Sequence, residues 1–368
     1  MSTLKTVTIL HPSSAVNNIV NDASGNVAVG NNLTVAGDIT SSSTVVMGSS
    51  FKRNRIINGN MLIDQRNAGA SVTQTTTVLY TVDRWAVYGT VASKFTIQQN
   101  AGSVTPPAGF TNYLGITSSS AYSVTASDVF WLSQYVEGYN VADLGWGAAG
   151  AQSVTLSFWV RSSLTGTFGG ALRNSANTRS YPFSYTISAA NTWEQKTITV
   201  AGDTTGTWLT TNGTGVNLLF GLGVGSTTSG TAGAWAATNY VSATGAVSVV
   251  GTNGATFYVT GVQLEVGTKA TPYEMQIYSD QLAQCQRYYE TGAIYAYVSI
   301  SGLYETTAYY KQTMRASPTV NLTVLASSNV TSGPAPDQGN SPTNIFGYYF
   351  TLSAAGYCHS SFTASAEL

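Results

Sequence analysis

The sequence predicts an all-β protein, and three observations lead to this prediction. Short segments in which apolar and polar residues alternate recur along the whole chain of 368 residues, separated by Gly, Ser, Asn and Thr. Few stretches keep a helical period for more than three turns. Hydrophobic residues make up 43% of the chain and its net charge is only −1, whereas disordered chains combine low hydrophobicity with high net charge. We therefore expect the chain to fold, and its length allows two or three domains.

The N-terminal fifty residues contain few large side chains. Two apolar pairs, Val27 with Val29 and Leu33 with Val35, are each followed by a Gly or Asn turn. Such a segment cannot build a core within one chain, so neighbouring chains must cover its apolar face, and three copies around one axis are the simplest closed arrangement. We predict that residues 1–50 are a trimerisation and attachment segment. Their many serines leave a flexible linker as the alternative.

The middle of the chain contains enough predicted strands for two packed sheets. Residues 154–161 alternate strictly, which assigns Val154, Leu156, Phe158 and Val160 to the core face and Thr155, Ser157, Trp159 and Arg161 to the other face. Further strands are predicted over 91–98, 129–136, 181–187, 194–200, 216–222, 246–250 and 256–265. Residues 51–275 are therefore predicted to form a β-sandwich.

One short α-helix is predicted over 279–290. Leu282, Cys285 and Tyr289 share one face of this helix, and Gly292 provides a stop signal. Cys285 is then expected to be a buried thiol that packs as a small hydrophobic side chain.

The last part of the chain, 276–368, is predicted to combine this helix with a small β domain. It holds half of the 22 tyrosines of the protein. Its strands are predicted over 294–300, 306–311, 319–325, 346–354 and 358–364.

Several motifs resemble those of bacteriophage tail-fibre and receptor-binding proteins. Residues 54–66 and 263–274 are similar to the opening and closing strands of the jelly-roll module in these proteins, a module also found among carbohydrate-binding domains. Residues 281–290 resemble the Leu-x-x-Cys-Gln-Arg-Tyr-Tyr helix that follows the closing strand. Residues 314–320 and 364–368 resemble the closing hairpins of the fibre tips. An Asn-Leu-Thr-Val-x-Gly-x-Ile run close to the N-terminus is similar to runs in trimeric phage fibres.

The resemblance implies a homotrimeric virion appendage with a jelly-roll body. Residues 1–50 would attach it to other virion proteins, and the expected location is the tail, with the head surface as an alternative. The expected function is non-covalent recognition of host cell-surface polysaccharide. Two alternatives remain: a capsid-surface fibre or structural adaptor without receptor binding, and a tailspike that degrades polysaccharide.

Composition argues against several other classes of function. The 15 basic and 16 acidic residues leave no basic patch for nucleic acid. No apolar run is long enough to span a membrane, so membrane insertion is not expected, and the N-terminus lacks the pattern of a signal peptide. Cys285 and Cys358 lack the spacing of a zinc site or a disulfide framework.

The sequence offers few residues that could act as catalytic groups, and we predict no enzymatic activity. The two histidines are His11 and His359, and Cys358 beside His359 would point to the opposite face of a strand. A glycosidase needs two carboxylates that face a groove, and the acids outside predicted turns are Asp83, Asp128, Glu137, Asp143, Glu265 and Glu274. The resemblance gives Asp83 and Glu265 structural roles: Asp83 would pair with Arg84, and Glu265 would cap backbone donors or hold a calcium ion. No cofactor is predicted beyond that optional calcium.

Aromatic residues carry the prediction of carbohydrate binding, because a sugar ring packs its C–H face on Trp or Tyr. Trp85, Trp159 and Trp193 lie in strand-like segments and are assigned to packing. The candidate glycan contacts are Trp131, Tyr139, Trp146, Trp208 and Trp235 in or near loops, and Tyr304, Tyr309 and Tyr348 in the C-terminal part. An aromatic core between subunits is the equal alternative for the C-terminal tyrosines.

Overall fold

The computed structural model describes residues 8–9, 19–21, 27–29, 52–337 and 342–368. The chain divides into two compact units, Met1–Ser50 and Phe51–Leu368. Its first unit contains a three-stranded antiparallel sheet of β1 (Thr8–Ile9), β2 (Ile19–Asn21) and β3 (Val27–Val29). Val27 and Val29 therefore lie in a strand, whereas Leu33, Val35 and His11 lie outside the described residues. Trimerisation through 1–50 stays a prediction.

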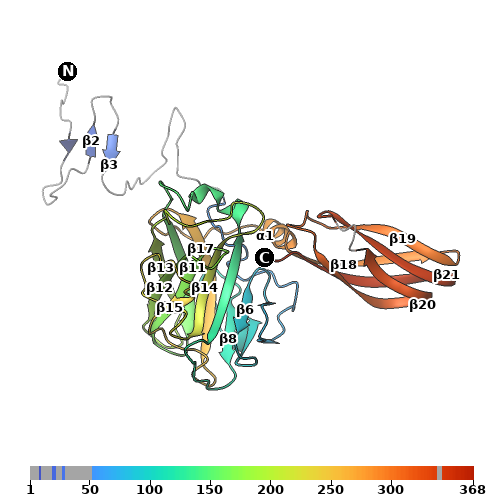
Figure 1. Ribbon diagram of the computed structural model, residues 1–368, viewed down its shortest axis with the longest axis horizontal. Helices are drawn as coiled ribbons and strands as arrows, with labels where there is room; N and C mark the ends of the chain where they lie inside the picture. The colour runs from blue at the N-terminus through green and yellow to red at the C-terminus, as the bar shows by residue number, and fades with distance from the viewer. Residues whose placement is uncertain (1–7, 10–18, 22–26, 30–51, 338–341) are drawn as a thin grey trace. The chain divides into compact units, whose positions relative to one another are not determined.

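The second unit contains a β-sandwich of two six-stranded antiparallel sheets (Figure 1). The first sheet has the spatial order β13 (Glu194–Val200), β10 (Val154–Ser162), β17 (Thr256–Val266), β8 (Leu114–Ser118), β7 (Phe95–Gln99) and β4 (Val72–Thr73). The second sheet has the order β12 (Ser180–Ile187), β11 (Gly166–Arg173), β14 (Thr214–Val224), β9 (Val129–Glu137), β6 (Ala86–Gly89) and β5 (Leu79–Tyr80). Shorter elements are the parallel pair β15 (Ser229–Gly230) and β16 (Ser242–Ala243) and the 3₁₀ turns η1 (Ala101–Ser103), η2 (Gly138–Asn140) and η3 (Ala142–Leu144).

The core lies between these two sheets. Leu156 and Phe158 of β10 are fully buried, as the alternation in 154–161 predicts. Phe158 meets Phe220 of β14 edge to face, with ring centroids 5.0 Å apart. Burying such a side chain stabilises the fold by about 1.5–3 kcal/mol, so this layer of aromatic and aliphatic residues holds the two sheets together.

The prediction of an all-β fold with a sandwich, one short α-helix and a C-terminal β domain is confirmed. Two predicted strands of the sandwich differ from the structure. The strand predicted over 91–98 begins only at Phe95, because the chain turns at Ser93, where φ is 62°. Residues 246–250 form no strand. The amides of Val249 and Val250 both bind the carbonyl of Leu222, so the chain wraps over β14 there instead of pairing along it.

The opening segment 54–66 contacts the closing strand but is not itself a strand. The Asn54 side chain bonds to the backbone of Val262 and Leu264 in β17, at 3.0 Å each. A Cβ atom on Gly59 would lie 2.1 Å from the carbonyl oxygen of Val262, so only glycine fits this approach. The two motifs therefore meet as the resemblance implies, through turns and side chains instead of a strand pair.

Helix α1 (Tyr278–Gln286) and four strands form the C-terminal part. The strands are β18 (Tyr289–Val298), β19 (Gly302–Tyr309), β20 (Thr319–Asp337) and β21 (Ile345–Ser365), and β21 pairs with each of the others. The helix is shorter than predicted because Tyr289 and Glu290 pair with Ser365 and Ala364 of β21. The two strands predicted over 346–354 and 358–364 are one continuous strand. Cys285 is fully buried, as predicted, and burial raises the pKa of its thiol well above the usual value.

None of the helices in the described ranges combines the length and the apolar character needed to cross a lipid bilayer. The domain limits at 275 and 276 stay predictions.

Candidate functional site

Three of the predicted glycan contacts come together in one tryptophan cluster. Trp146, Trp208 and Trp235 lie in separate loops, and their ring centroids are 4.7 to 5.3 Å apart in edge-to-face pairs. Arg179, which donates two hydrogen bonds of 2.6 and 2.7 Å to Asp203, lies over the Trp235 ring.

The indole N–H groups of the tryptophan cluster all have hydrogen-bond partners within the chain. The indole N–H groups of Trp146, Trp208 and Trp235 donate to backbone carbonyls at 2.8, 3.2 and 2.7 Å, respectively. The cavity beside Trp146 and Trp208 measures only about 10 Å³, which is room for one water molecule. The cluster fastens loops to the core, and a contact between these residues and a glycan stays a prediction.

Trp131 lies on the outer face of the second sheet. Its ring stacks on Tyr88 at 5.5 Å between centroids and is only 6% exposed. Little of its surface is therefore free for a sugar ring.

The predicted tyrosines of the C-terminal part separate into different environments. Tyr309 is 74% exposed, Tyr304 packs on Phe350, and Tyr348 is fully buried with its hydroxyl beside Ser360. Tyr348 therefore offers no surface to a ligand, because it points into the core of the C-terminal sheet. Sequence reasoning missed Tyr295 and Tyr297 on β18, which are 64% and 63% exposed. Their alternation with the buried Ala296 was the signal that could have found them.

An open groove of about 550 Å³ lined by aromatic side chains lies on the outside of the first sheet. We call it the Trp159 groove. Trp159 of β10 lines it together with Phe110 and Tyr273, and Gln195 and Thr197 of β13 provide polar side chains. The remaining lining residues are Ala108, Gly109, Ala270, Thr271, Pro272 and Met275.

Local backbone geometry shapes the Trp159 groove. The register between β10 and β17 shifts between Ser157 and Trp159, and such bulges redirect side chains. Opposite this shift, Gly261 has a φ of 60°, and a Cβ atom there would lie 2.6 Å from the Phe110 ring. Phe110 and Tyr273 meet edge to face at 5.2 Å. The absence of a side chain at Gly261 therefore lets the aromatic rings close over the strand.

The polar atoms of the Trp159 groove differ from those of the tryptophan cluster. Five of the seven tryptophans donate their indole N–H to a backbone carbonyl, namely Trp85, Trp146, Trp193, Trp208 and Trp235. Within the described ranges, the indole N–H of Trp159 and the side chains of Gln195 and Thr197 have no hydrogen-bond partner. These groups are free to bind the hydroxyls of a ligand.

The arrangement in the Trp159 groove suits a sugar. Aromatic rings pack against the C–H face of a pyranose, and the amide, hydroxyl and indole groups can bond its hydroxyls. No carboxylate lines the groove in the described part of the chain, so it lacks the paired acids of glycoside hydrolysis. The sequence placed Trp159 on the outer face of its strand but assigned it to packing. The polar neighbours on β13, which alternate outward at Gln195 and Thr197, were the overlooked signal.

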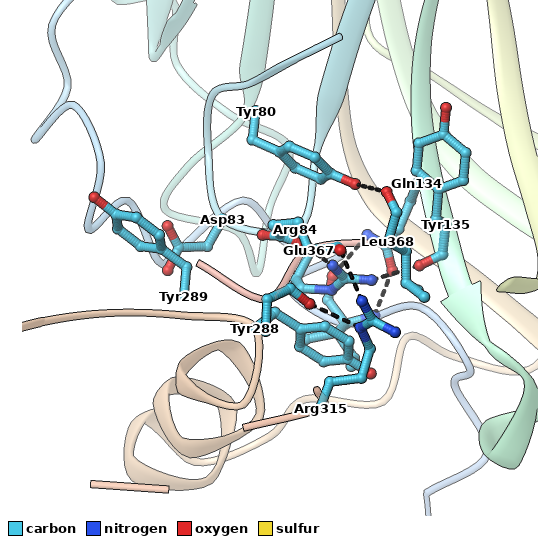
Figure 2. Close-up of polar contacts among 12 residues, drawn as sticks. Tyr80, Asp83, Arg84, Gln134, Tyr135, Tyr288, Tyr289, Arg315, Glu367 and Leu368 are labelled. Carbon is cyan, nitrogen blue, oxygen red and sulfur yellow. Dashed lines mark hydrogen bonds and ion pairs between the residues drawn. The ribbon is translucent and has the colours of Figure 1, made fainter. Parts of the chain in front are cut away.

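A buried polar network joins residues 366–368 to the sandwich (Figure 2). Arg84 and Arg66 both bind the Glu367 carboxylate, and Arg84 stacks on Tyr288 at 3.6 Å. Arg315 donates to the carbonyls of Ala366 and Glu367 at 2.7 and 2.9 Å. We call this network the C-terminal latch. The Glu367 carboxylate is thus held by two cations of the same chain.

Asp83 lies beside the C-terminal latch but forms no ion pair with Arg84 among the described residues, so the predicted pairing is wrong. Its carboxylate instead accepts the backbone and side-chain N–H groups of Gln65, at 3.2 and 2.5 Å. Burial raises the pKa of Asp83 to about 7, and the bonds from Gln65 offset only part of that effect.

The other candidate acids are also held by internal partners. Asp128 accepts four hydrogen bonds, from Thr90, Tyr122 and twice from Thr125, which outweigh its burial and lower its pKa to about 2. The remaining partners are Arg287 and Tyr288 for Glu137, Arg55 for Asp143, Thr271 and Gln263 for Glu265, and the Asn54 amide for Glu274.

Glu265 caps backbone and side-chain donors, as one of the two implied roles requires. Thr271 donates its amide to one carboxylate oxygen at 2.8 Å and its hydroxyl to the other at 2.7 Å. These occupied oxygens do not fit a calcium ligand, and no group of three or more His, Cys, Asp or Glu that could hold a metal occurs in the described ranges. A calcium ion elsewhere stays a prediction.

No family model matches the sequence, and no curated protein matches it. Among solved structures, the enzymatically active domain of tailspike protein 4 from bacteriophage CBA120 is similar over 58% of this chain and 22% of that one, at 11% identity and a TM-score of 0.32. A sugar-binding protein from Bacteroides thetaiotaomicron, so described provisionally, is similar over 58% of this chain and 100% of that one, at 13% identity and a TM-score of 0.34. A family 11 carbohydrate-binding module from Clostridium thermocellum is similar over 54% of this chain and 98% of that one, at 11% identity and a TM-score of 0.27. The chain thus spans about a fifth of the length of the tailspike structure.

Proposed function

We propose that the protein binds a cell-surface glycan non-covalently through the Trp159 groove, as a homotrimeric fibre on the tail of a phage virion. The observation that carries the glycan assignment is the open aromatic lining of Phe110, Trp159 and Tyr273 beside unpaired polar groups. Indole, amide and hydroxyl groups without internal partners are the complement of a sugar's hydroxyls. The motif resemblance supports the placement on a virion and the attachment through residues 1–50.

The proposed mechanism is recognition without covalent chemistry. One open groove of this kind binds weakly, since ligand affinity depends on how much of the ligand's surface is buried. Three copies on one stem raise the overall affinity when the host surface presents repeated epitopes. Static light scattering of the full chain tests this directly, and the expected mass is three times the 38.5 kDa of one chain.

The test of the glycan site compares Trp159→Ala with Trp208→Ala by titration calorimetry, using purified host surface polysaccharide and neutral oligosaccharides. Trp159→Ala should weaken binding at least tenfold, which corresponds to about 1.4 kcal/mol. Trp208→Ala, in the tryptophan cluster, should leave the affinity of the folded protein unchanged. The reverse pattern would place the site in the tryptophan cluster, and no binding by the unaltered protein would favour a structural adaptor.

The same polysaccharide tests for cleavage. We expect its viscosity and its content of reducing ends to stay constant during incubation with the protein. A fall in viscosity together with released oligosaccharides would identify a degrading tailspike and would overturn the proposal of pure binding.

A further inference from the structure

A row of three polar side chains crosses the outer face of the second sheet. Arg173 of β11 is paired with Asn217 of β14, and Asn217 is paired with Tyr135 of β9. Directly paired residues point to the same face of a sheet. Their neighbours Leu172 and Leu218 lie in the core, so alternation along the strands places the row on the outside. We call these three residues the Arg173 row.

The Arg173 guanidinium is a buried cation that forms no ion pair in the described ranges. Only 7% of the residue is exposed. Its Nη1 group donates to Oδ1 of Asn239 at 2.6 Å, and its Nε–H has no partner among the residues that the structure describes. A guanidinium offers five N–H donors, so most of the donors of Arg173 are not used within the described chain.

The acids of neighbouring segments do not neutralise Arg173. Glu137 of β9 forms an ion pair with Arg287, and Asp203 forms one with Arg179. Each of these carboxylates is thus matched by a guanidinium of its own. Burial lowers the pKa of Arg173, and no carboxylate of the described part of the chain offsets this effect. Because a buried charge without a counter-ion costs stability, packing alone does not account for an arginine at this position.

The surroundings of Arg173 suit the hydroxyls and the apolar face of a sugar. Asn217 accepts a hydrogen bond from the Ser133 hydroxyl and contacts the Tyr135 hydroxyl through its amide. The Tyr135 ring is half-buried and points away from the C-terminal latch (Figure 2). It meets Trp131 edge to face at 6.3 Å between centroids, and Trp131 also supports the half-buried ring of Tyr88. Amides, a hydroxyl and aromatic rings of this kind are typical of sugar sites.

A loop brings the protein partner of Arg173 to the surface. Ser180 of β12, which is paired with Arg173, donates to the carbonyl of Thr238 at 2.6 Å and accepts the amide of Tyr240 at 3.2 Å. These two bonds hold the intervening Asn239 beside the guanidinium, and Asn239 is exposed. A ligand that contacts Asn239 from the solvent therefore also reaches the end of the Arg173 side chain.

We propose that the Arg173 row binds a carboxylate-bearing sugar residue, with the carboxylate on the free N–H donors of Arg173 and the ring beside Tyr135. One carboxylate supplies the single negative charge that the guanidinium lacks, and hydrogen bonds between these two groups are among the stronger ones in proteins. The site lies on the second sheet, whereas the Trp159 groove lies on the first sheet. The inference therefore goes beyond the proposed function and does not depend on it.

The test measures, by titration calorimetry, the binding of a glucuronate-containing oligosaccharide and of its methyl ester, which keeps the sugar and removes the charge. At low ionic strength the acid should bind the full-length protein roughly three- to tenfold more tightly than the ester, and added salt should reduce this preference. Arg173→Met should abolish the preference, and Tyr135→Phe should weaken it. Lys94→Gln, which removes one positive charge just before β7 of the first sheet, is the matched control and should retain it.

Stability provides a second readout, which separates a binding role of Arg173 from a structural one. Because its charge is buried without a counter-ion, Arg173→Met should leave the midpoint of chemical denaturation unchanged or raise it. The acid should raise the melting temperature of the unaltered protein but not that of Arg173→Met. A lower midpoint for Arg173→Met, together with no effect of the acid on the unaltered protein, would assign the guanidinium to the fold alone and overturn the proposal.

The Arg173 row and the Trp159 groove can fail independently. If the unaltered protein binds acid and ester equally, or if the preference survives Arg173→Met, the Arg173 row is not a carboxylate site. Neutral oligosaccharides that still depend on Trp159 in that case leave the proposed function intact. Trp159→Ala should keep the preference for the acid, because the groove lies on the other sheet. Circular dichroism of each variant checks that the fold is retained.

Discussion

The tryptophan cluster and the Trp159 groove each bring three large aromatic side chains together, yet they present opposite surfaces. In the cluster, Trp146, Trp208 and Trp235 direct their indole N–H groups into backbone carbonyls and leave a cavity of about 10 Å³. In the groove, Trp159 has no partner for its N–H among the described residues and lies in an opening of about 550 Å³. The number of aromatic rings therefore says little about binding. What distinguishes the two regions is whether their polar atoms are already used.

The largest expected difference between the tryptophan cluster and the Trp159 groove is the effect of Trp146→Ala on stability. Because this ring is buried among the other rings of the cluster, we expect a loss of about 3–5 kcal/mol in the free energy of unfolding. Chemical denaturation measures this loss, and glycan affinity of the remaining folded protein should not change. A stable variant with reduced affinity would show that the cluster, not the groove, contacts the ligand.

The second prediction contrasts the pH dependence of stability and of binding. Asp83 has its pKa raised by burial to about 7, from an ordinary value of 3.8. Well below pH 3.8 the Asp83 carboxyl is protonated in both the folded and the unfolded chain, so its burial does not lower the free energy of unfolding. As the pH rises towards 7 the unfolded chain loses its proton first, so the free energy of unfolding falls by up to about 4 kcal/mol.

Denaturation of Asp83→Asn and of the unaltered protein between pH 4 and 8 checks this slope. The free energy of unfolding of the unaltered protein, taken relative to that of Asp83→Asn, should fall as the pH rises and become constant above about pH 7. Neutral-sugar binding should stay flat over the same range, because no Asp, Glu or His lines the Trp159 groove in the described ranges. Equal slopes in both proteins would contradict the assignment to Asp83.

The third prediction concerns Gly261, whose missing side chain makes room for the rings of the groove. Gly261→Ala places a Cβ atom 2.6 Å from Phe110 at a φ of 60°, whereas Gly254→Ala has a φ of 72° and nothing within 4 Å. Both variants should lose about 1–2 kcal/mol of stability from backbone strain. Only Gly261→Ala should also weaken neutral-sugar binding. Titration with neutral sugar and thermal melts of the two variants test this prediction. Equal sugar affinities of Gly261→Ala and Gly254→Ala would contradict it.

The smallest expected effect tests the free indole N–H itself. Trp159→Phe keeps an aromatic ring and removes one donor, so the affinity should fall by about 0.5–1.5 kcal/mol, the net value of one hydrogen bond. Trp131→Phe, on the outer face of the other sheet, is the matched control and should bind normally. An unchanged affinity of Trp159→Phe would mean that ring stacking alone holds the sugar.

Alternation in the sequence predicted most of the sandwich, because each strand buries one face. It did so for β10, whose four core residues and outward Trp159 were assigned correctly. The same rule could not choose between Tyr348 and Tyr349, since the burial of a whole strand depends on which neighbour covers it. Tyr348 proved buried and Tyr349 exposed. The end of α1 was missed for a related reason: pairing with β21 overrode the helical period at Tyr289.

The candidate site was less predictable than the fold. Loop tryptophans were preferred because binding residues tend to lie on loops, but their hydrogen-bond partners come from distant segments that sequence spacing does not reveal. Trp235, for example, donates to Ala201 in another loop. The Trp159 groove likewise requires residues from segments far apart in the sequence, such as Phe110 and Tyr273.

The C-terminal latch has a mechanical consequence. The chain leaves the sandwich through α1 and returns to it at residues 366–368. There Arg315 donates hydrogen bonds to the carbonyls of Ala366 and Glu367, and Arg84 forms an ion pair with the Glu367 carboxylate (Figure 2). The C-terminal sheet is thus joined to the sandwich at two places, the α1 segment and residues 366–368. Separation at the second place must break the contacts of Glu367 and Ala366 together. Unfolding of the C-terminal sheet from its last residue must therefore first break the ion pairs of Glu367 with Arg66 and Arg84.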